Sequence, residues 1–505
     1  MSSANQANLY AAYSRHFPPP ETELLTTEAG ASYTYADAES YSAQVANYLI
    51  ASGLCKGDRV TAQVEKSADV LWLYLGVIRA GMVFHPLNPA YTDAELQYFL
   101  QDASPSMLIC DSSRAESLGA LCKQAGTAHL LTLDMDGSGT FMQAVRNCSI
   151  QFETVPTAAD DLAALVYSSG TTGRPKGIML SHKNLVENIT VLVDIWGFVR
   201  TDRLLHALPM FHVHGLFVAI GCVLASGSRM HLLQSFQVGA VMENLPHCTV
   251  MMGVPTYYTR LLAEPLFTAK CCEHMRLFIS GSAPLRAETF VAFEQRTGHS
   301  ILERYGMTET GMNTSNPLCG VRRPGTVGKP LPGVTVRICG AGNRILDANE
   351  VGELQVRGDN VFVGYWNKPE KTLQDFTADG FFVTGDQALI DEEGYISIVG
   401  RSKDMIISGG LNVYPKEIEL LIDALPGVKE SAIIGLPDAD FGEAVVAVVV
   451  LSEGFTLTAD QIRKAVGLKA ANFKVPKKVF FVDELPRNAM GKVQKEVLRK
   501  NYSEI

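Results

Sequence analysis

A strand-helix-strand-helix pattern runs through residues 59–101, RVTAQVEKSADVLWLYLGVIRAGMVFHPLNPAYTDAELQYFLQ. It divides into strand-like runs at 59–64 and 82–87 and helical runs at 70–80 and 92–101. Alternation of this kind predicts an α/β fold in which helices cover a mostly parallel sheet.

The pattern changes twice farther along the chain. Segment 334–357 has short β-like runs separated by turns, which is typical of a smaller β subdomain. After residue 400 we expect a compact α+β unit with a helix behind Pro415, strands at 432–436, 444–450 and 478–482, and a helix at 459–469. The sequence therefore predicts an α/β protein with a large N-terminal domain of sheet-and-helix layers plus a β subdomain (1–400) and, beyond residues 401–404, a small α+β C-terminal domain (405–505).

Composition argues against several classes of function. The 505 residues carry 43 Lys and Arg against 53 Asp and Glu, and the net charge of −10 gives no global footprint for nucleic acid. The 10 cysteines form no CxxC pair, which disfavours a zinc ribbon or a thioredoxin-like motif. There is neither a secretory h-region at the N-terminus nor an apolar run of the roughly 18 residues that a membrane helix needs. We expect a cytoplasmic enzyme, with the mitochondrial matrix as the alternative, that is a monomer or weak homodimer without nucleic-acid or membrane partners.

The most informative motif is YSSGTTGRPKG at residues 167–177, directly after an apolar run. Its glycines allow the backbone close to a ligand, its hydroxyl groups are donors and Lys176 adds positive charge, which together suit a polyphosphate. It is not a Walker A loop, because Pro175 stands five residues after Gly170. A flexible Ser/Gly linker is the alternative interpretation.

Four further segments carry residue types suited to a nucleotide and its metal. ERYGMTE at 303–309 places an acidic residue beside a Thr hydroxyl, which suits Mg²⁺ bridging phosphates. TGD at 384–386 has a turn-borne carboxylate suited to a ribose diol, and GRSKD at 400–404 lies at the expected domain boundary. PRNAMGK at 486–492 sets one lysine in a loop rich in Gly and Pro, where a solvated surface lysine is the alternative.

These motifs, in this order and spacing, resemble the adenylate-forming superfamily, which includes acyl-CoA synthetases, firefly luciferase and the adenylation domains of peptide synthetases. The resemblance extends over essentially the whole chain. It implies that ATP and a carboxylate form acyl-AMP and pyrophosphate, after which the acyl group passes to CoA. Mg²⁺ is the implied cofactor, ATP and CoA are co-substrates, and the C-terminal domain would rotate between the two half-reactions about Lys403.

The resemblance also assigns roles to individual residues. The catalytic residues would be Lys492, Thr308, Glu309 and His212. Glu309 would hold Mg²⁺, and Lys492 would reach the reacting carboxylate and α-phosphate. ATP would be bound by Ser168, Ser169, Gly170, Thr171, Thr172, Gly173, Lys176, Ser282, Ala283, Pro284, Glu303, Tyr305, Gly306, Met307, Thr308, Asp386, Arg401 and Lys492. The CoA path would pass Ser408, Gly409 and Gly410.

Two arginines bear on the identity of the carboxylic acid. Arg304 precedes the tyrosine of YGMTE, where most relatives have a small residue, and Arg260 ends a segment that lines the acyl pocket in relatives. A guanidinium beside the reacting groups is costly unless an anion pairs with it, so we expect a short substrate with a second carboxylate. A structural ion pair for Arg304 and a solvated helix position for Arg260 are the alternatives.

Four strings, MMGVPTYYTRLL, LFISGSAPL, LERYGMTETGMNTSNP and GGLNVYPKEIE, resemble the malonate-activating subfamily. The resemblance implies synthesis of malonyl-CoA, AMP and pyrophosphate from malonate, ATP and CoA through malonyl-AMP. Malonate would be held by Arg260, Ser282, Arg304, His212 and Met307. His212 would be an aromatic gate, with a satisfied core histidine as the alternative. Alternative functions are a ligase for methylmalonate, succinate or a short-chain fatty acid, and an adenylation enzyme that loads a carrier-protein thiol.

Overall fold

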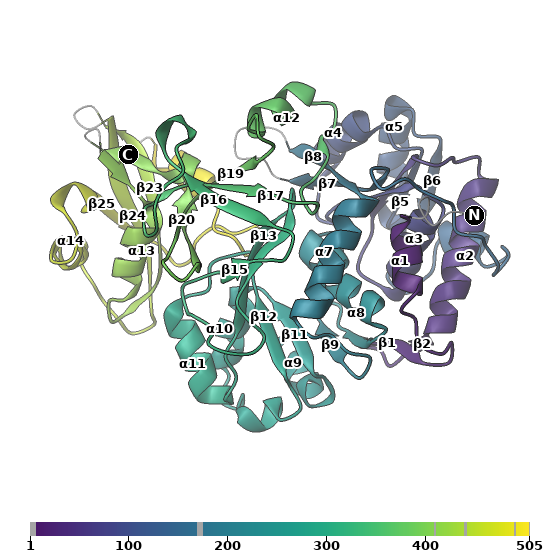
Figure 1. Ribbon diagram of the computed structural model, residues 1–505, viewed down its shortest axis with the longest axis horizontal. Coiled ribbons are helices and arrows are strands. Elements are labelled where there is room, and N and C mark those ends of the chain that lie inside the picture. Colours follow the sequence, from purple (N-terminus) through teal and green to yellow (C-terminus); the bar gives the residue numbers. More distant parts are fainter. Residues whose placement is uncertain (1–6, 169–174, 409–410, 439–441, 489–490, 504–505) are drawn as a thin grey trace.

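Two large sheets form the N-terminal part of the computed structural model, which describes residues 7–168, 175–408, 411–438, 442–488 and 491–503 (Figure 1). The seven-stranded sheet has the order β18 (Gly364–Tyr365), β8 (Lys176–Ser181), β7 (Leu162–Ser168), β4 (Val83–Pro86), β3 (Arg59–Gln63), β5 (Met107–Cys110), β6 (His129–Thr132). The nine-stranded sheet has the order β15 (Lys329–Pro330), β14 (Gly311–Ser315), β13 (Leu302–Met307), β12 (Leu277–Ser280), β11 (Val250–Gly253), β9 (Arg203–His206), β10 (Arg229–Leu232), β1 (Glu23–Thr27), β2 (Ser32–Thr34).

Both sheets are parallel at their centres; the nine-stranded sheet is antiparallel at both edges and the seven-stranded sheet at the β18 edge alone. Strands β9 to β13 pair in parallel, whereas β13 and β14 form an antiparallel pair. In the other sheet β4, β3, β5 and β6 are parallel and β7 with β8 is antiparallel. This arrangement confirms the predicted α/β fold class.

Helices connect and cover these strands. In the N-terminal part they are α1 (Leu9–Ser14), α2 (Tyr35–Ala51), α3 (Ala68–Arg79), α4 (Asp93–Ala103), α5 (Ala115–Ala125), α6 (Thr140–Val145), α7 (His182–Ile195), α8 (Gly221–Ser226), α9 (Val238–Asn244), α10 (Pro255–Ala263), α11 (Ala287–Thr297) and α12 (Pro369–Asp375). Helix α3 is apolar on all sides and almost wholly buried, as expected for a helix in the centre of a large domain. Thr92 and Glu95 form a capping box that starts α4.

Two smaller sheets complete the fold. The antiparallel sheet β16 (Thr335–Cys339), β17 (Gly352–Arg357), β19 (Phe382–Ile390), β20 (Ile396–Arg401) extends the predicted β subdomain. The prediction missed β19, which pairs with the distant strand β17, and β20, which joins the sheet through β19. The last sheet contains β22 (Leu411–Val413), β21 (Ile406–Ser408), β24 (Gly442–Leu451), β23 (Val428–Asp438) and β25 (Lys478–Phe481), with α13 (Pro415–Asp423), α14 (Ala459–Gly467) and α15 (Lys495–Tyr502). The elements predicted after residue 400 are thus confirmed.

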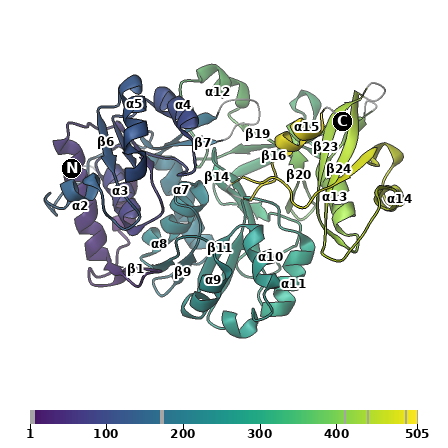
Figure 2. The same cartoon turned by 180° about the vertical axis from the view of Figure 1, so that it is seen from behind.

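The two ends of the chain occupy opposite ends of the molecule in both views. Helices α13 and α14 and strands β23 and β24 lie at one end, whereas α2 and α3 lie at the other (Figures 1 and 2). Strand β20 ends at Arg401 and β21 begins at Ile406, so the predicted hinge lies between the β subdomain and the C-terminal sheet. None of the described helices is both long and apolar enough to cross a bilayer.

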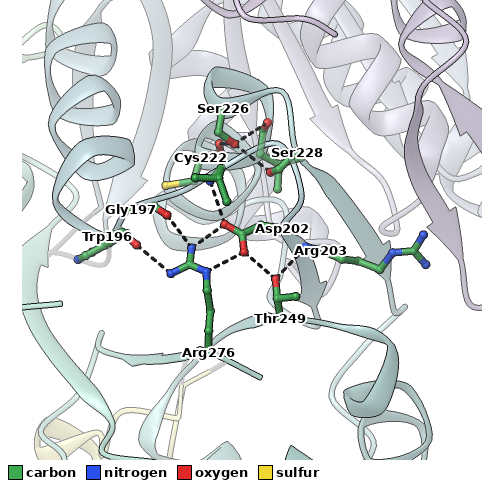
Figure 3. A network of polar contacts seen from close by, with 11 residues as sticks. Trp196, Gly197, Asp202, Arg203, Cys222, Ser226, Ser228, Thr249 and Arg276 are labelled. Atoms are coloured by element: carbon green, nitrogen blue, oxygen red, sulfur yellow. Dashed lines mark hydrogen bonds and ion pairs between the residues drawn. The ribbon is translucent and has the colours of Figure 1, made fainter. Parts of the chain in front are cut away.

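A buried ion pair joins α7 to the nine-stranded sheet (Figure 3). Asp202, with a side chain 2% exposed, accepts hydrogen bonds from Arg276 Nε at 2.7 Å and Nη2 at 2.6 Å and from Thr249 Oγ1 at 2.8 Å. Arg276 also donates to the carbonyl oxygens of Trp196 and Gly197 at the end of α7. The network supplies hydrogen bonds to a buried carboxylate. It lies at the amino ends of β9, β11 and β12.

Candidate active site

Three of the predicted acyl-site residues gather at the carboxyl ends of neighbouring parallel strands. His212 lies beyond β9, as does His214, which was not predicted for the site; Ser282 follows β12, and Arg304 is on β13 beside it. Ligands of open α/β sheets bind at this edge, because the loops beyond successive strands converge there. The order β9, β11, β12, β13 therefore brings four sequence segments to one place.

Arg304 is a buried cation with unused hydrogen-bond donors. Its residue is 2% exposed, and its Nε and Nη2 are buried without a hydrogen-bond partner. A Cβ added to Gly281 would lie 2.5 Å from Arg304 Cζ, so a side chain at position 281 would displace the guanidinium. Burial lowers the pKa of Arg304 to about 10, which leaves it charged at neutral pH. Within the described part of the chain no carboxylate forms an ion pair with it, and this arrangement suits an anionic ligand.

Ser282 stands on a tight turn beside Arg304. Its φ of +70° is in the left-handed region, which is uncommon for a residue with a side chain and is often found at functional turns. Its Oγ lies 3.2 Å from Nδ1 of His214. Burial lowers the pKa of His214 well below its usual value, so this ring is neutral. The turn of Ser282, Ala283 and Pro284 thus presents a hydroxyl near the guanidinium.

Glu303 forms a hydrogen bond with the residue that follows this turn. Its Oε1 accepts a hydrogen bond from the Leu285 amide at 3.1 Å, and burial raises its pKa to about 8. Glu303 was predicted for the ATP site, and its side chain contacts the loop that carries Ser282.

A second group of residues joins β13 to the β subdomain. Arg401 Nε pairs with Asp386 Oδ1 at 2.7 Å, and Tyr305 donates its hydroxyl hydrogen to Asp386 Oδ2. The pairing of β19 with β20 sets Asp386 opposite Arg401. Asp386 and Arg401 were both predicted to hold ribose, and the structure brings them together beside Tyr305.

The structure describes the two ends of the glycine-rich motif, Ser168 and Lys176. Ser168 at the end of β7 stands opposite Lys176 at the start of β8. Lys176 Nζ lies 3.9 Å from Asp375 Oδ2 and 4.2 Å from the ring centre of Tyr365. Burial lowers the pKa of Lys176, and the charge of Glu309 opposes that change, which places these two groups near each other. The remaining predicted phosphate binders, Ser169, Gly170, Thr171, Thr172 and Gly173, lie outside the described residues.

Lys492 reaches this site from the C-terminal domain. Its side chain keeps solvent access, yet desolvation by the surrounding walls and the charge of Arg401 lower the pKa of its ammonium group. Asp386, Glu309 and Arg304 also act on Lys492 electrostatically. Burial and the charge of Lys492 lower the pKa of His212 to about 4, so His212 is neutral. The structure therefore gathers the predicted lysine and carboxylates around one volume.

The last residues of β13 and the residue after it are less buried than Arg304. Gly306, Met307 and Thr308 are half-buried, and Met307 Sδ lies 3.9 Å from the Tyr305 hydroxyl. Glu309 is buried, and burial raises the pKa of its carboxyl.

Arg260 lines a pocket to which Arg304 does not contribute. It is exposed on α10 and lines a pocket of about 330 Å³ with Lys66, Phe211 and Tyr257, and neither Arg304 nor Ser282 lines that pocket. Lys66, which sequence reasoning missed, is buried and donates to the carbonyl oxygen of His206 at 2.9 Å. Its only sequence signal is a lysine between apolar segments.

Two further predictions concern the region after β20. Lys403 lies in the 3₁₀ turn Ser402–Asp404, and burial lowers its pKa. Ser408 is buried at the end of β21, and its Oγ has no hydrogen-bond partner. Gly409 and Gly410 lie outside the described residues.

Comparisons with known proteins agree with this geometry. The AMP-binding enzyme family matches residues 14–366, and the AMP-binding enzyme C-terminal domain matches residues 417–492. Malonate–CoA ligase of Arabidopsis thaliana is 37% identical over 481 residues, which cover 89% of this chain and 79% of that protein. The crystal structure of ATP-bound MatB from Rhodopseudomonas palustris has 51% identity and a TM-score of 0.97 with 99% of both chains covered. The apo MatB structure, with equal coverage, has a TM-score of 0.86, so this chain is closer to the ATP-bound arrangement.

Proposed function

The chain belongs to the AMP-binding enzyme family, and we propose that it is an ATP-dependent malonate–CoA ligase. It converts malonate, ATP and CoA into malonyl-CoA, AMP and pyrophosphate through malonyl-AMP. The observation that carries the choice of substrate is the buried guanidinium of Arg304 with its two unused donors. A plain fatty acid would leave this cation buried and unpaired, whereas the second carboxylate of malonate pairs with it.

The same residues limit the length of the acid. Arg304 precedes Tyr305 on β13, and Tyr305 contacts the ribose-site carboxylate of Asp386. Lys492 is close enough to both Arg304 and Asp386 to feel their charges. A diacid that reacts beside Lys492 with one carboxylate and pairs with Arg304 through the other is therefore short. Ser282 would donate its hydroxyl hydrogen to the distal carboxylate.

The first half-reaction brings two anions together. Attack of a carboxylate on an anionic α-phosphate is opposed by like charge, so cations must line the approach. Lys492 would neutralise the charge that develops between the carboxylate and the α-phosphate. Lys176 would bind the outer phosphates and Thr308 the α-phosphate, while Asp386 and Arg401 would hold the ribose hydroxyls. The peptide turn at Ser282 to Pro284 and the Tyr305 ring would flank adenine.

Glu309 is suited to Mg²⁺. It is a buried carboxylate close to Lys176, and Mg²⁺ binds proteins through one or two carboxylates together with substrate phosphates. The raised pKa of Glu309 fits a group that is stabilised as an anion once a cation is near. When bound, Mg²⁺ supplies neutralisation of phosphate charge.

The second half-reaction needs a thiol at the acyl carbon. We place the route of CoA past Ser408, Gly409 and Gly410, with His212 as the gate and Lys403 as the hinge about which the C-terminal domain (405–505) turns away from residues 1–400. The proposal further takes the enzyme to be cytoplasmic and a monomer or weak homodimer, which cell fractionation and size-exclusion chromatography test.

A substrate panel tests the proposed function. The purified chain is incubated with ATP, Mg²⁺, CoA and each of a series of C2 to C6 mono- and dicarboxylates, and AMP release and the thioester mass are recorded. We expect malonate to be preferred and malonyl-CoA to form with free CoA. Preference for succinate or a fatty acid would overturn the substrate assignment. Malonyl-AMP formation without transfer to free CoA would favour a carrier-protein thiol as acceptor.

A further inference from the structure

Arg286, at the end of the loop 281–286 that carries Ser282, contacts the C-terminal domain. Arg286 Nη2 pairs with Asp423 Oδ2 at 2.9 Å, and Arg286 Nη1 donates to the carbonyl oxygen of Lys429 at 2.7 Å. The Asp423 side chain is 6% exposed and also accepts from Ser431 Oγ at 2.7 Å. Arg286 comes from the N-terminal part of the chain, whereas its partners lie at the end of α13 and the start of β23.

The local structure of Arg286 does not explain its charge. It is the N-cap residue of α11 and makes no capping hydrogen bond with its side chain. A cation at a helix N-terminus is opposed by the helix dipole, and Ser, Thr, Asp or Asn are the residues that stabilise this position. The contacts that use the guanidinium are those to the C-terminal domain.

A chain of contacts continues from these partners to the catalytic lysine. Glu430, next to Lys429, pairs with Arg487 in the loop that carries Lys492. Arg487 Nη1 in turn donates to the carbonyl oxygen of Gly491 at 2.6 Å. Gly491 precedes Lys492, so the strand that Arg286 holds also fixes the backbone from which the lysine extends.

The other end of the Arg286 loop lies in the acyl site. Leu285 donates its amide hydrogen to Glu303, and Ser282 contacts His214. The segment 281–286 is thus held at one end by the strand that bears Arg304 and at the other by the C-terminal domain.

We propose that Arg286 is a positioning residue for the adenylation step, which holds the C-terminal domain so that Lys492 faces the acyl and phosphate groups. This inference rests on the proposed function. Because the domain must turn away for thioester formation, the contacts of Arg286 with Asp423 and Lys429 break before the second half-reaction. Arg286 therefore serves the first half-reaction alone.

Separate assays of the two half-reactions test this role in the full-length enzyme. Arg286→Ala should slow malonyl-AMP formation from ATP and malonate by about 5- to 20-fold, in the range of conformational coupling. Thioester formation from supplied malonyl-AMP and CoA should be unchanged. Asp423→Asn, which keeps the shape of the side chain, should show the same split, and Arg286→Lys should recover part of the loss.

A control is Arg337→Ala, because Arg337 pairs with Asp379, a more exposed carboxylate, inside the β subdomain. Neither half-reaction should change in this variant. Equal loss of both half-reactions in Arg286→Ala, or no loss in the first, would overturn the positioning role. A wild-type enzyme that forms no malonyl-AMP would instead refute the proposed function.

Discussion

Replacing Arg304 with methionine should change activity and stability in opposite directions. Methionine keeps a long side chain but removes the charge and the two buried donors that lack partners. Breaking a buried charge pair with a ligand costs about 2–5 kcal/mol, which corresponds to a loss of about 30- to 5,000-fold in kcat/KM for malonate. Removal of an unsatisfied buried cation should raise the free energy of unfolding of the ligand-free protein by about 1–3 kcal/mol.

Steady-state AMP release with malonate and with propionate measures the first effect, and thermal melting without ligands measures the second. The ratio of kcat/KM for malonate over propionate should fall, because propionate makes no use of the guanidinium. Arg344→Met is the control, since the Arg344 side chain is 66% exposed and its nearest carboxylate, in Glu350, is 3.8 Å away. Retained malonate turnover in Arg304→Met would refute the role of Arg304, and a lower melting temperature would refute the electrostatic account of its burial.

Three further predictions follow from other parts of the structure. Lys492→Ala should slow malonyl-AMP formation by about 10²–10³-fold, as for a lost transition-state donor, and leave thioester formation from supplied malonyl-AMP intact; equal losses would contradict this. Burial raises the pKa of Glu303 from 4.5 to about 8, so its contribution to stability is full below pH 4.5 and is lost as the pH rises to about 8. In thermal melts Glu303→Gln should therefore gain on wild type between pH 5 and 8 and then level off, whereas a difference independent of pH would argue against it. Arg276→Ala should lower the free energy of unfolding in urea by about 2–3 kcal/mol, because Asp202 is left buried and unpaired; an unchanged urea midpoint would show that the pair adds no stability.

The sequence predicted those parts of the fold that depend on local signals. Helix α4 begins at a capping box whose members are three residues apart, and β24 is a run of apolar residues in the sequence. Strand β19 was missed because its partner β17 lies on the other side of helix α12 in the sequence, and β20 joins the subdomain through β19. Pairing of strands that lie far apart in the sequence, such as β17 with β19, leaves no local pattern from which it can be predicted.

In the candidate site too, some residues were predicted from the sequence and others were not. Asp386, Arg401 and Tyr305 were predicted from motifs, and the structure brings them into contact. The pair of Arg286 with Asp423 was not predicted, because its members lie in separate domains and neither stands in a motif. Its one sequence signal was a cation in front of a helix, where an uncharged or acidic cap is favoured.

The charged groups of the site act on the ammonium group of Lys492. Desolvation lowers the pKa of Lys492, and the charges of Arg401 and Arg304 add to this change, so the ammonium is least stable when the cations are alone. An anionic ligand reverses the sign of that interaction, since a carboxylate or phosphate nearby favours the charged amine. Lys492 therefore gains most from its position when malonate and ATP are both present. We expect the pair of Arg286 with Asp423, which lies outside the site, to hold the C-terminal domain before either ligand is bound, because the pair does not depend on the ligands.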